Sequence, residues 1–121
     1  MKVMPQEIEV WYLIPSLRKE ISRILVEKYG FSQKEVSKTM KISEGAVSQY
    51  LKSKRGNDLE FNKKELSEIK KSAKNIAENP EEANQELYKV CVALRGSKSM
   101  CDLHKKYDPS VPKNCDLCSK N

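Results

Sequence analysis

The sequence contains few aromatic residues, a single histidine and no long apolar run. Aromatic residues make up 7% of the 121 residues and hydrophobic residues 38%, which is enough for a modest helical core but little for a large catalytic cleft. No apolar stretch approaches the roughly 20 residues that cross a bilayer. The start of the chain also lacks the basic, apolar and small-residue segments of a secretory signal. We therefore expect a soluble cytoplasmic protein with one compact domain, or a small domain with an appended module.

Positive charge is concentrated in one part of the chain. Lysine and arginine number 23 against 17 aspartate and glutamate, which gives a formal net charge of +6. Residues 28–55 hold seven basic and two acidic side chains, so this stretch carries five of the six net charges. A basic surface attracts polyanions because it neutralises phosphates and releases their counterions. A solvated helix face has the same composition, so charge alone leaves both interpretations open.

The hydrophobic pattern of the first half predicts helices after a short extended start. The apolar run of residues 8–14 is β-branched and aromatic, which is compatible with a short N-terminal strand, and a helix is the alternative at this length. Proline and glycine delimit a first helix at residues 15–29. Two serine caps, the first completed by a glutamate three residues later, predict a second helix at residues 33–40 and a third at residues 44–54.

The second half also follows helical spacing, up to Gly96. Asn62 and Glu65 form a capping pattern that begins a fourth helix. A proline after Asn79 separates this helix from a fifth, which carries Cys91. Beyond Gly96 the periodicity disappears, and we expect a tail that needs a ligand to become ordered. The predicted fold class is therefore mainly α.

Residues 33–52 match the pattern of a helix-turn-helix. The expected core positions are Val36, Met40, Ile42, Val47 and Tyr50, and the small Ser37 lies where the two helices cross. In this motif the second helix enters the major groove of DNA, and glutamine can read adenine in bidentate fashion. Amides at the start of the first helix can bind phosphate. The residues predicted to bind DNA are Ser32, Gln33, Ser43, Glu44, Gly45, Ser48, Gln49, Lys52, Lys54 and Arg55.

The stretch "FSQKEVSKTMKISEGAVSQYLKSKRG" resembles the helix-turn-helix of phage-repressor-like (XRE-type) regulators, with a lambda-repressor-like fold. The flanking segments "EIEVWYLIPSLRKEI" and "VCVALRGSKSMCDLH" extend the resemblance to a family of short archaeal transcriptional regulators. The resemblance implies a DNA-binding regulator with a cysteine-bearing C-terminal module. One position departs from the pattern, because the turn often has glycine where this chain has Lys41.

All four cysteines lie in the last 31 residues, in the order Cys91-x9-Cys101-x2-His104-x10-Cys115-x2-Cys118. The two residues between Cys115 and Cys118 let both thiols point into one site. An iron–sulfur cluster, of the 4Fe–4S or a related type, would use the four thiolates. Structural zinc would use the four cysteines, or His104 in place of Cys91. The resemblance to cysteine-bearing regulators favours the cluster, which would make the protein a redox, iron or sulfur sensor.

Other interpretations of these residues remain open. Cys91 lies at helical spacing and is compatible with a small buried hydrophobic residue, and His104 is equally compatible with a surface position. Trp11 and Tyr12 fit a core or a subunit interface better than a base-stacking platform. A redox-active disulfide between Cys115 and Cys118 is a further alternative. A thiol-redox enzyme is disfavoured because no βαβ pattern is present, and we expect no enzymatic activity.

The sequence thus predicts three segments and one regulatory function. Residues 1–57 would hold the N-terminal segment and the helix-turn-helix, residues 58–90 a helical linker or dimerisation region, and residues 91–121 the cysteine-rich module. The predicted function is sequence-specific binding of double-stranded DNA by a homodimer, because two-fold operators favour dimers. The alternatives are a regulator with purely structural zinc, or a zinc-stabilised adaptor that binds protein or RNA.

Overall fold

The protein is mainly helical. The computed structural model describes residues 5–57, 59–94 and 97–107, and this part of the chain contains helices and no strand. The elements are α1 (Pro5–Ile8), the π-helix η1 (Glu9–Leu13), α2 (Ile14–Glu27), α3 (Gln33–Met40), α4 (Glu44–Leu51), α5 (Lys63–Glu78), the 3-10 helix η2 (Pro80–Glu82), α6 (Ala83–Leu94) and α7 (Lys98–Tyr107). The mainly α fold class is confirmed. None of the helices in the described ranges combines the length and apolar character needed to cross a membrane.

The prediction of a short N-terminal strand is wrong. The described residues of that segment are helical from Pro5 onward. The buried positions Ile8, Leu13 and Leu17 are spaced by five residues and then by four. An α-helix would turn Ile8 away from Leu13, whereas the wider turn of a π-helix brings both to the buried side. The β-branched and aromatic content of residues 8–14 favours a strand. The five-residue spacing from Ile8 to Leu13, followed by the four-residue spacing to Leu17, instead fits a π-helix that continues into an α-helix.

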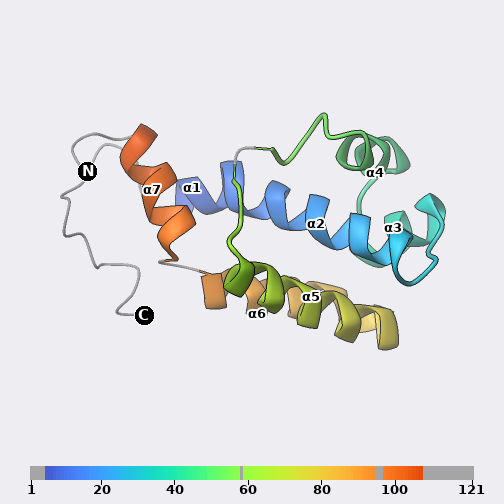
Figure 1. Cartoon of the computed structure of the whole chain (residues 1–121). Helices are drawn as coiled ribbons and strands as arrows, with labels where there is room; N and C mark the ends of the chain where they lie inside the picture. Colours follow the sequence, from blue (N-terminus) through green and yellow to red (C-terminus); the bar gives the residue numbers. More distant parts are fainter. Residues whose placement is uncertain (1–4, 58, 95–96, 108–121) are drawn as a thin grey trace.

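α2 lies at the centre of the molecule. It contacts α3, α4 and α5, while α6 packs against α5 and α7 packs against α1. Figure 1 shows α3 and α4 at one end of α2 and α7 at the other end, with α4 and α5 on opposite sides of α2. One cluster of buried residues joins these helices, and its fully buried members include Ile8, Leu17, Ile21, Val36, Val47, Ile69 and Ile76.

The turn between α3 and α4 is closed by hydrogen bonds to Ser37. The amides of Lys41 and Ile42 both donate to the Ser37 carbonyl, and the Ser37 hydroxyl donates to the Ile42 carbonyl at 2.6 Å. Lys41 adopts a left-handed conformation with φ 56° and ψ 45°. This is the conformation that glycine adopts without steric cost at the end of a helix. Lys41 therefore makes the turn that a glycine would make, at the expense of some backbone strain.

Lys41→Gly is expected to stabilise the protein by about 0.5–1 kcal/mol, because glycine relieves the left-handed strain. Lys38→Gly is the matched control, since it removes the same charge from the interior of α3. That change should cost about 1 kcal/mol in helix propensity. Urea unfolding followed by circular dichroism measures both changes. Equal destabilisation by the two substitutions would show that Lys41 is not strained.

α7 differs from the expected tail. Residues 98–107 form a helix. The prediction that regular structure ends at Gly96 is therefore wrong for this segment. Ser97 begins the helix, because its hydroxyl accepts from the Met100 amide at 3.3 Å. Met100, Leu103 and His104 are buried at helical spacing. One of the three buried positions is a histidine, which does not mark an apolar helix face in the sequence, so the spacing alone does not reveal this helix.

α5 is tied to α7 by its N-terminal cap. Asn62 and Glu65 form the capping box that the sequence predicts. The Glu65 carboxylate is buried, and it also accepts from the Ser99 hydroxyl at 2.6 Å. One carboxylate thus fixes both the start of α5 and the position of α7.

Candidate nucleic-acid interface and cysteine residues

α4 has one buried face and one polar face. Val47 and Tyr50 are buried, with exposed fractions of 0% and 4%. The opposite face is polar, and its residues recur at helical spacing: Glu44, Gly45, Ser48, Gln49 and Lys52. All of these are exposed except Ser48, which is half-buried. The structure thus places the predicted base-reading side chains outward on one helical face.

Serine caps leave backbone donors at the starts of α3 and α4. The Ser43 hydroxyl accepts from the Ala46 amide at 3.0 Å, and the Ser32 hydroxyl accepts from the Glu35 amide at 3.0 Å. The remaining first-turn amides of a helix have no intrahelical acceptor. At α3 these are the amides of Gln33 and Lys34, whereas the Ser32 amide already donates to the Glu35 carboxylate at 3.2 Å.

α4 ends earlier than the sequence predicts. Its last residue is Leu51 instead of a position near Lys54, because Ser53 adopts a left-handed conformation with φ 57°. The Ser53 amide donates to the Tyr50 carbonyl, and the Lys54 amide donates to the Gln49 carbonyl at 2.8 Å. This hydrogen-bond pair is a Schellman motif, which ends a helix and reverses the chain.

Three basic side chains follow the polar face of α4. Lys52, Lys54 and Arg55 are all exposed, and they lie in the cap and the bend after the helix. Cations are favoured at this end because the helix dipole is negative there. We call these three residues the basic group after α4; its Lys54 lies next to Gln49, because the Lys54 amide donates to the Gln49 carbonyl.

The bend after α4, residues 52–57, is held against α2 by contacts that the sequence does not predict. Gly56 is buried with φ +75°, and a Cβ at this position would lie 2.5 Å from the Pro15 carbonyl oxygen and 2.9 Å from the Lys19 Cβ. The Lys19 ammonium donates to the Asn57 side-chain oxygen at 2.5 Å. The Asn57 amide group donates in turn to the Ser53 carbonyl. A glycine after a basic run predicts a turn, but it does not indicate which helix the turn approaches.

The described cysteines lie on two different helices. Cys91 on α6 is buried with 8% exposed, whereas Cys101 on α7 is partly exposed. His104 is 5% exposed, so the surface alternative for this residue is wrong. Cys115 and Cys118 lie outside the described residues. Among the residues described, no three His, Cys, Asp or Glu side chains form a group that could hold a metal ion.

The π-helix η1 presents apolar side chains to solvent. Trp11 is 51% exposed and Val10 is 60% exposed, whereas Tyr12 is half-buried. The rings of Trp11 and Tyr12 meet edge to face at a centroid distance of 6.4 Å. The core alternative is therefore wrong for Trp11, and its place at a subunit interface stays a prediction.

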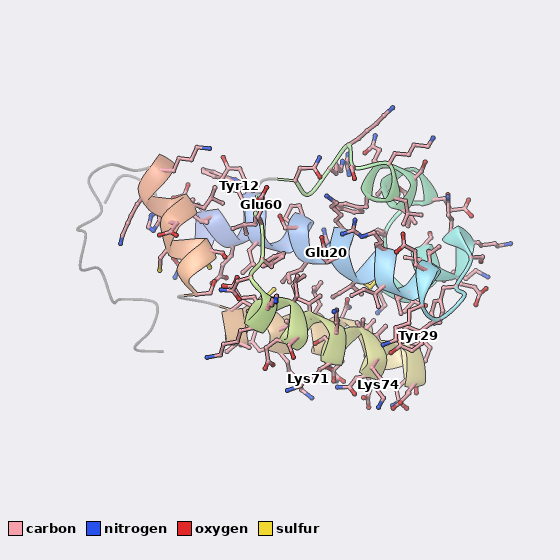
Figure 2. The ribbon with its side chains drawn as sticks, in the orientation of Figure 1. Tyr12, Glu20, Tyr29, Glu60, Lys71 and Lys74 are labelled. Carbon is pink, nitrogen blue, oxygen red and sulfur yellow. The ribbon has the colours of Figure 1, made fainter. Side chains whose placement is uncertain are left out.

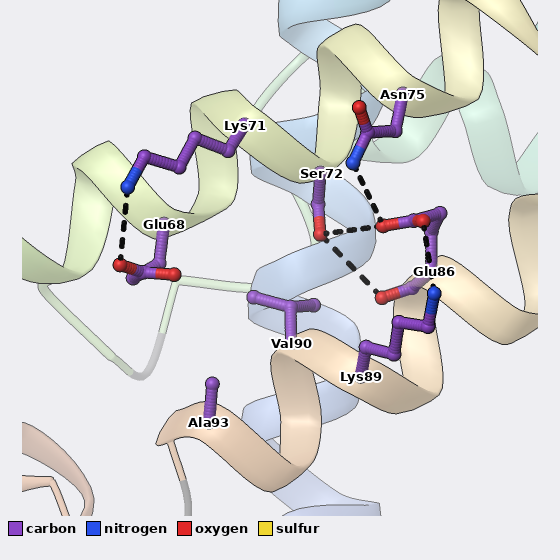
Figure 3. A pocket seen from close by; sticks show the side chains of 8 residues that line it. All are labelled: Glu68, Lys71, Ser72, Asn75, Glu86, Lys89, Val90 and Ala93. Atoms are coloured by element: carbon purple, nitrogen blue, oxygen red, sulfur yellow. Dashed lines mark hydrogen bonds and ion pairs between the residues drawn. The ribbon is translucent and has the colours of Figure 1, made fainter.

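A pocket of about 300 Å³ lies between α5 and α6. Figure 3 shows its polar lining, in which Lys89 pairs with Glu86 at 3.6 Å and Lys71 pairs with Glu68 at 3.7 Å. The Ser72 hydroxyl lies 3.5 Å from the Glu86 carboxylate. Because these charges are paired with each other, the pocket has little net attraction for an ionic ligand. None of the predicted site residues lines it.

Neither the protein-family models nor the curated proteins nor the solved structures include a match to this chain.

Proposed function

We propose that the protein is a sequence-specific regulator that binds double-stranded DNA through a helix-turn-helix formed by α3 and α4. The observation that supports this most strongly is the outward face of α4, where exposed Gln49 lies beside half-buried Ser48. An α-helix fits the major groove, and glutamine and serine can form hydrogen bonds with base edges there. Gly45 has no side chain and Ser48 has a short one, so the helix can approach the bases closely at these positions while Gln49 extends toward them.

Electrostatics supports the same orientation. The basic group Lys52, Lys54 and Arg55 lies at the end of the reading helix and is exposed. In the proposed complex these side chains contact phosphates and set the register of α4 in the groove. The first-turn amides of α3, with the positive end of its dipole, contact a phosphate on the other side of the groove. Phosphate contacts at both sides would hold α4 in place without specifying sequence.

We further propose that the C-terminal cysteines make this regulator a sensor. Cys91 and Cys101 would hold an iron–sulfur cluster together with Cys115 and Cys118. Thiolate sulfur suits such a cluster. When bound, the cluster would supply a group that responds to oxidation or to iron and sulfur supply. The protein would act as a homodimer, because two-fold operators favour two copies of the reading helix.

The path from the cysteines to α4 runs through packed helices. α7, which carries Cys101, packs against α1, and α1 continues through η1 into α2. α2 contacts α4 directly. A change in the position of α7 would therefore act on α4 through two helix contacts and one continuous helical segment.

A structural zinc site is the second candidate for the cysteine module. One observation favours it: His104 is buried on α7, three residues after Cys101. Residues three apart on a helix are neighbours on its surface. Zinc binds both imidazole and thiolate in closed tetrahedral sites. In this alternative the site uses Cys101, His104, Cys115 and Cys118 and has no sensory role.

Gln49→Ala is expected to relax base preference. Duplexes that the unchanged chain selects from a random pool give the reference site. The affinity for that site is then compared with the affinity for duplexes in which one base pair at a time is replaced. A bidentate contact gives about 1–3 kcal/mol of discrimination against the wrong base, so preference at one position should fall about fivefold or more. Gln85→Ala, on the exposed side of α6, is the matched control and should leave the preference unchanged. If both variants keep full discrimination, α4 does not read the bases.

Purification without oxygen distinguishes the two cysteine chemistries. A cluster predicts visible absorption together with iron and acid-labile sulfide, all lost in a Cys101→Ser variant. Zinc predicts a colourless protein with one zinc ion per chain and no sulfide. His104→Asn separates the ligand sets further, because it should release zinc but leave an all-cysteine cluster in place. A colourless, sulfide-free protein would contradict the sensor proposal.

A further inference from the structure

α5 carries a second basic surface that the proposed reading helix does not use. Its lysines are Lys63, Lys64, Lys70, Lys71 and Lys74, and all five are exposed. We call this surface the lysine face of α5. The buried residues of the same helix include Glu65, Ile69, Ser72, Ala73 and Ile76. At 100° per residue these two sets lie on opposite sides of the helix axis, so the lysines point directly away from the core.

The lysines are only weakly neutralised by the protein itself. Lys71 lies 3.7 Å from Glu68, and both side chains are largely exposed. Within the described residues, no carboxylate lies within ion-pair distance of Lys63, Lys64, Lys70 or Lys74. An exposed i,i+3 pair contributes little. Glu78 is exposed one turn after Lys74, so the positive charge left for an external partner is strongest at Lys63, Lys64 and Lys70.

Two of these lysines occupy positions that are unfavourable for the helix. Lys63 and Lys64 are the first two residues of α5, where the helix dipole is positive and favours acidic side chains. The capping box of Asn62 and Glu65 compensates for this placement. Helix stability alone does not account for lysine at these positions, whereas binding of a polyanion does.

The lysine face points away from α4. Figure 1 shows α5 and α4 on opposite sides of α2, and Figure 2 shows Lys71 and Lys74 at the outer edge of α5. DNA is stiff over about 150 base pairs. One straight duplex seated on α4 therefore cannot also reach the lysine face of the same chain.

We propose that the lysine face of α5 binds the phosphate backbone of a second DNA duplex, so that one chain can bridge two DNA segments. That the polyanion is DNA rests on the proposed function. The presence of an exposed basic surface on α5 does not. From Lys63 to Lys74 the face extends about 16 Å, and this length of duplex carries about ten phosphate charges over its two strands, of which one side would face the protein. A membrane is disfavoured because interfacial helices insert apolar side chains, and the apolar side of α5 is buried against α2 and α6.

The test uses the full chain bound to an immobilised duplex and measures capture of a second, labelled duplex. We expect Lys70→Gln/Lys71→Gln/Lys74→Gln to reduce capture at least tenfold while affinity for the first duplex changes less than twofold. The salt slope of the capture step should become shallower by about 0.9 for each lysine that contacts a phosphate. The corresponding triple arginine variant keeps the charge and should keep capture. Lys105→Gln/Lys106→Gln, on α7, removes two positive charges elsewhere and controls for most of the loss of net charge.

A second variant separates binding from folding. Lys63→Gln/Lys64→Gln should raise Tm, because it removes like-signed charge from the positive end of the helix dipole. The same variant should reduce capture several-fold. A more stable protein with weaker capture cannot be explained by misfolding.

Several outcomes would overturn the proposal. They are absence of capture by the unchanged chain, full capture by the triple glutamine variant, and lysine-dependent binding to phosphatidylserine vesicles without binding to DNA. The outcome for the proposed function is separate. If Gln49→Ala changes no base preference and capture still depends on the α5 lysines, the reading helix is wrong and the lysine face stands. If only capture is insensitive to the α5 lysines, the lysine face is wrong and the regulator proposal stands.

Discussion

Gly56→Ala is expected to destabilise the protein by about 2–5 kcal/mol, the sum of left-handed backbone strain and overpacking. The new Cβ would lie 2.5 Å from the Pro15 carbonyl oxygen. That oxygen belongs to the backbone of α2 and cannot move aside as a flexible side chain would. The measurement is thermal unfolding, and Tm should fall by about 10 °C or more.

Gly30→Ala is the matched control for Gly56→Ala. Gly30 has nearly the same backbone conformation, φ +72°, but an added Cβ would meet nothing within 4 Å. Its substitution should therefore cost only the backbone strain of about 1 kcal/mol. The difference between the two variants isolates the contact between the bend and α2. Equal losses of stability would mean that Gly56 is not pressed against Pro15.

Lys52→Gln/Lys54→Gln/Arg55→Gln should weaken binding to all duplexes alike. Each lost phosphate contact makes the salt slope shallower by about 0.9, so at about 0.1 M salt the three together lower affinity by roughly two to three orders of magnitude. The effect should be the same on selected and random duplexes, because phosphate contacts carry no sequence information. Fluorescence anisotropy over a range of salt concentrations measures both the affinity and the slope.

The control for this triple variant is Lys52→Arg/Lys54→Arg, which keeps both charges. It should retain the salt slope of the unchanged chain. A triple glutamine variant with an unaltered slope would show that the group after α4 makes no phosphate contact. Circular dichroism should be the same for all three proteins, since the substituted side chains are exposed and follow the last residue of α4.

Local rules predict the α3–α4 region well. The caps at Ser32 and Ser43 are single-residue features whose hydrogen bonds involve only neighbours along the chain. The burial of Val36 and Val47 follows from helical spacing alone. The sequence places the end of α4 too late. Ser53 adopts the left-handed conformation that ends the helix, and in sequences this conformation is usually marked by glycine.

Features that depend on distant parts of the chain were not predictable. The burial of Gly56 depends on its approach to Pro15, about 40 positions earlier in the chain. The helix α7 depends on the burial of Met100 and His104, and α7 packs against α1, which lies far away in the sequence. The π-helix was missed because its composition favours a strand, and only its packing against the core selects the helix. The predicted use of Cys91 and Cys101 as ligands, and the three-segment division, remain predictions.

The central position of α2 has a consequence for how the molecule loses its structure. Its buried residues Leu17, Ile21 and Leu25 are fully covered, and α3, α4 and α5 all contact the helix. Opening any of these contacts exposes the same apolar helix to water, so none of the three neighbours is an independent cooperative unit. α7 lies at the other end of the molecule, where it packs against α1 and is held to the start of α5 by the Ser99–Glu65 hydrogen bond, so we expect it to open separately from the helices around α2.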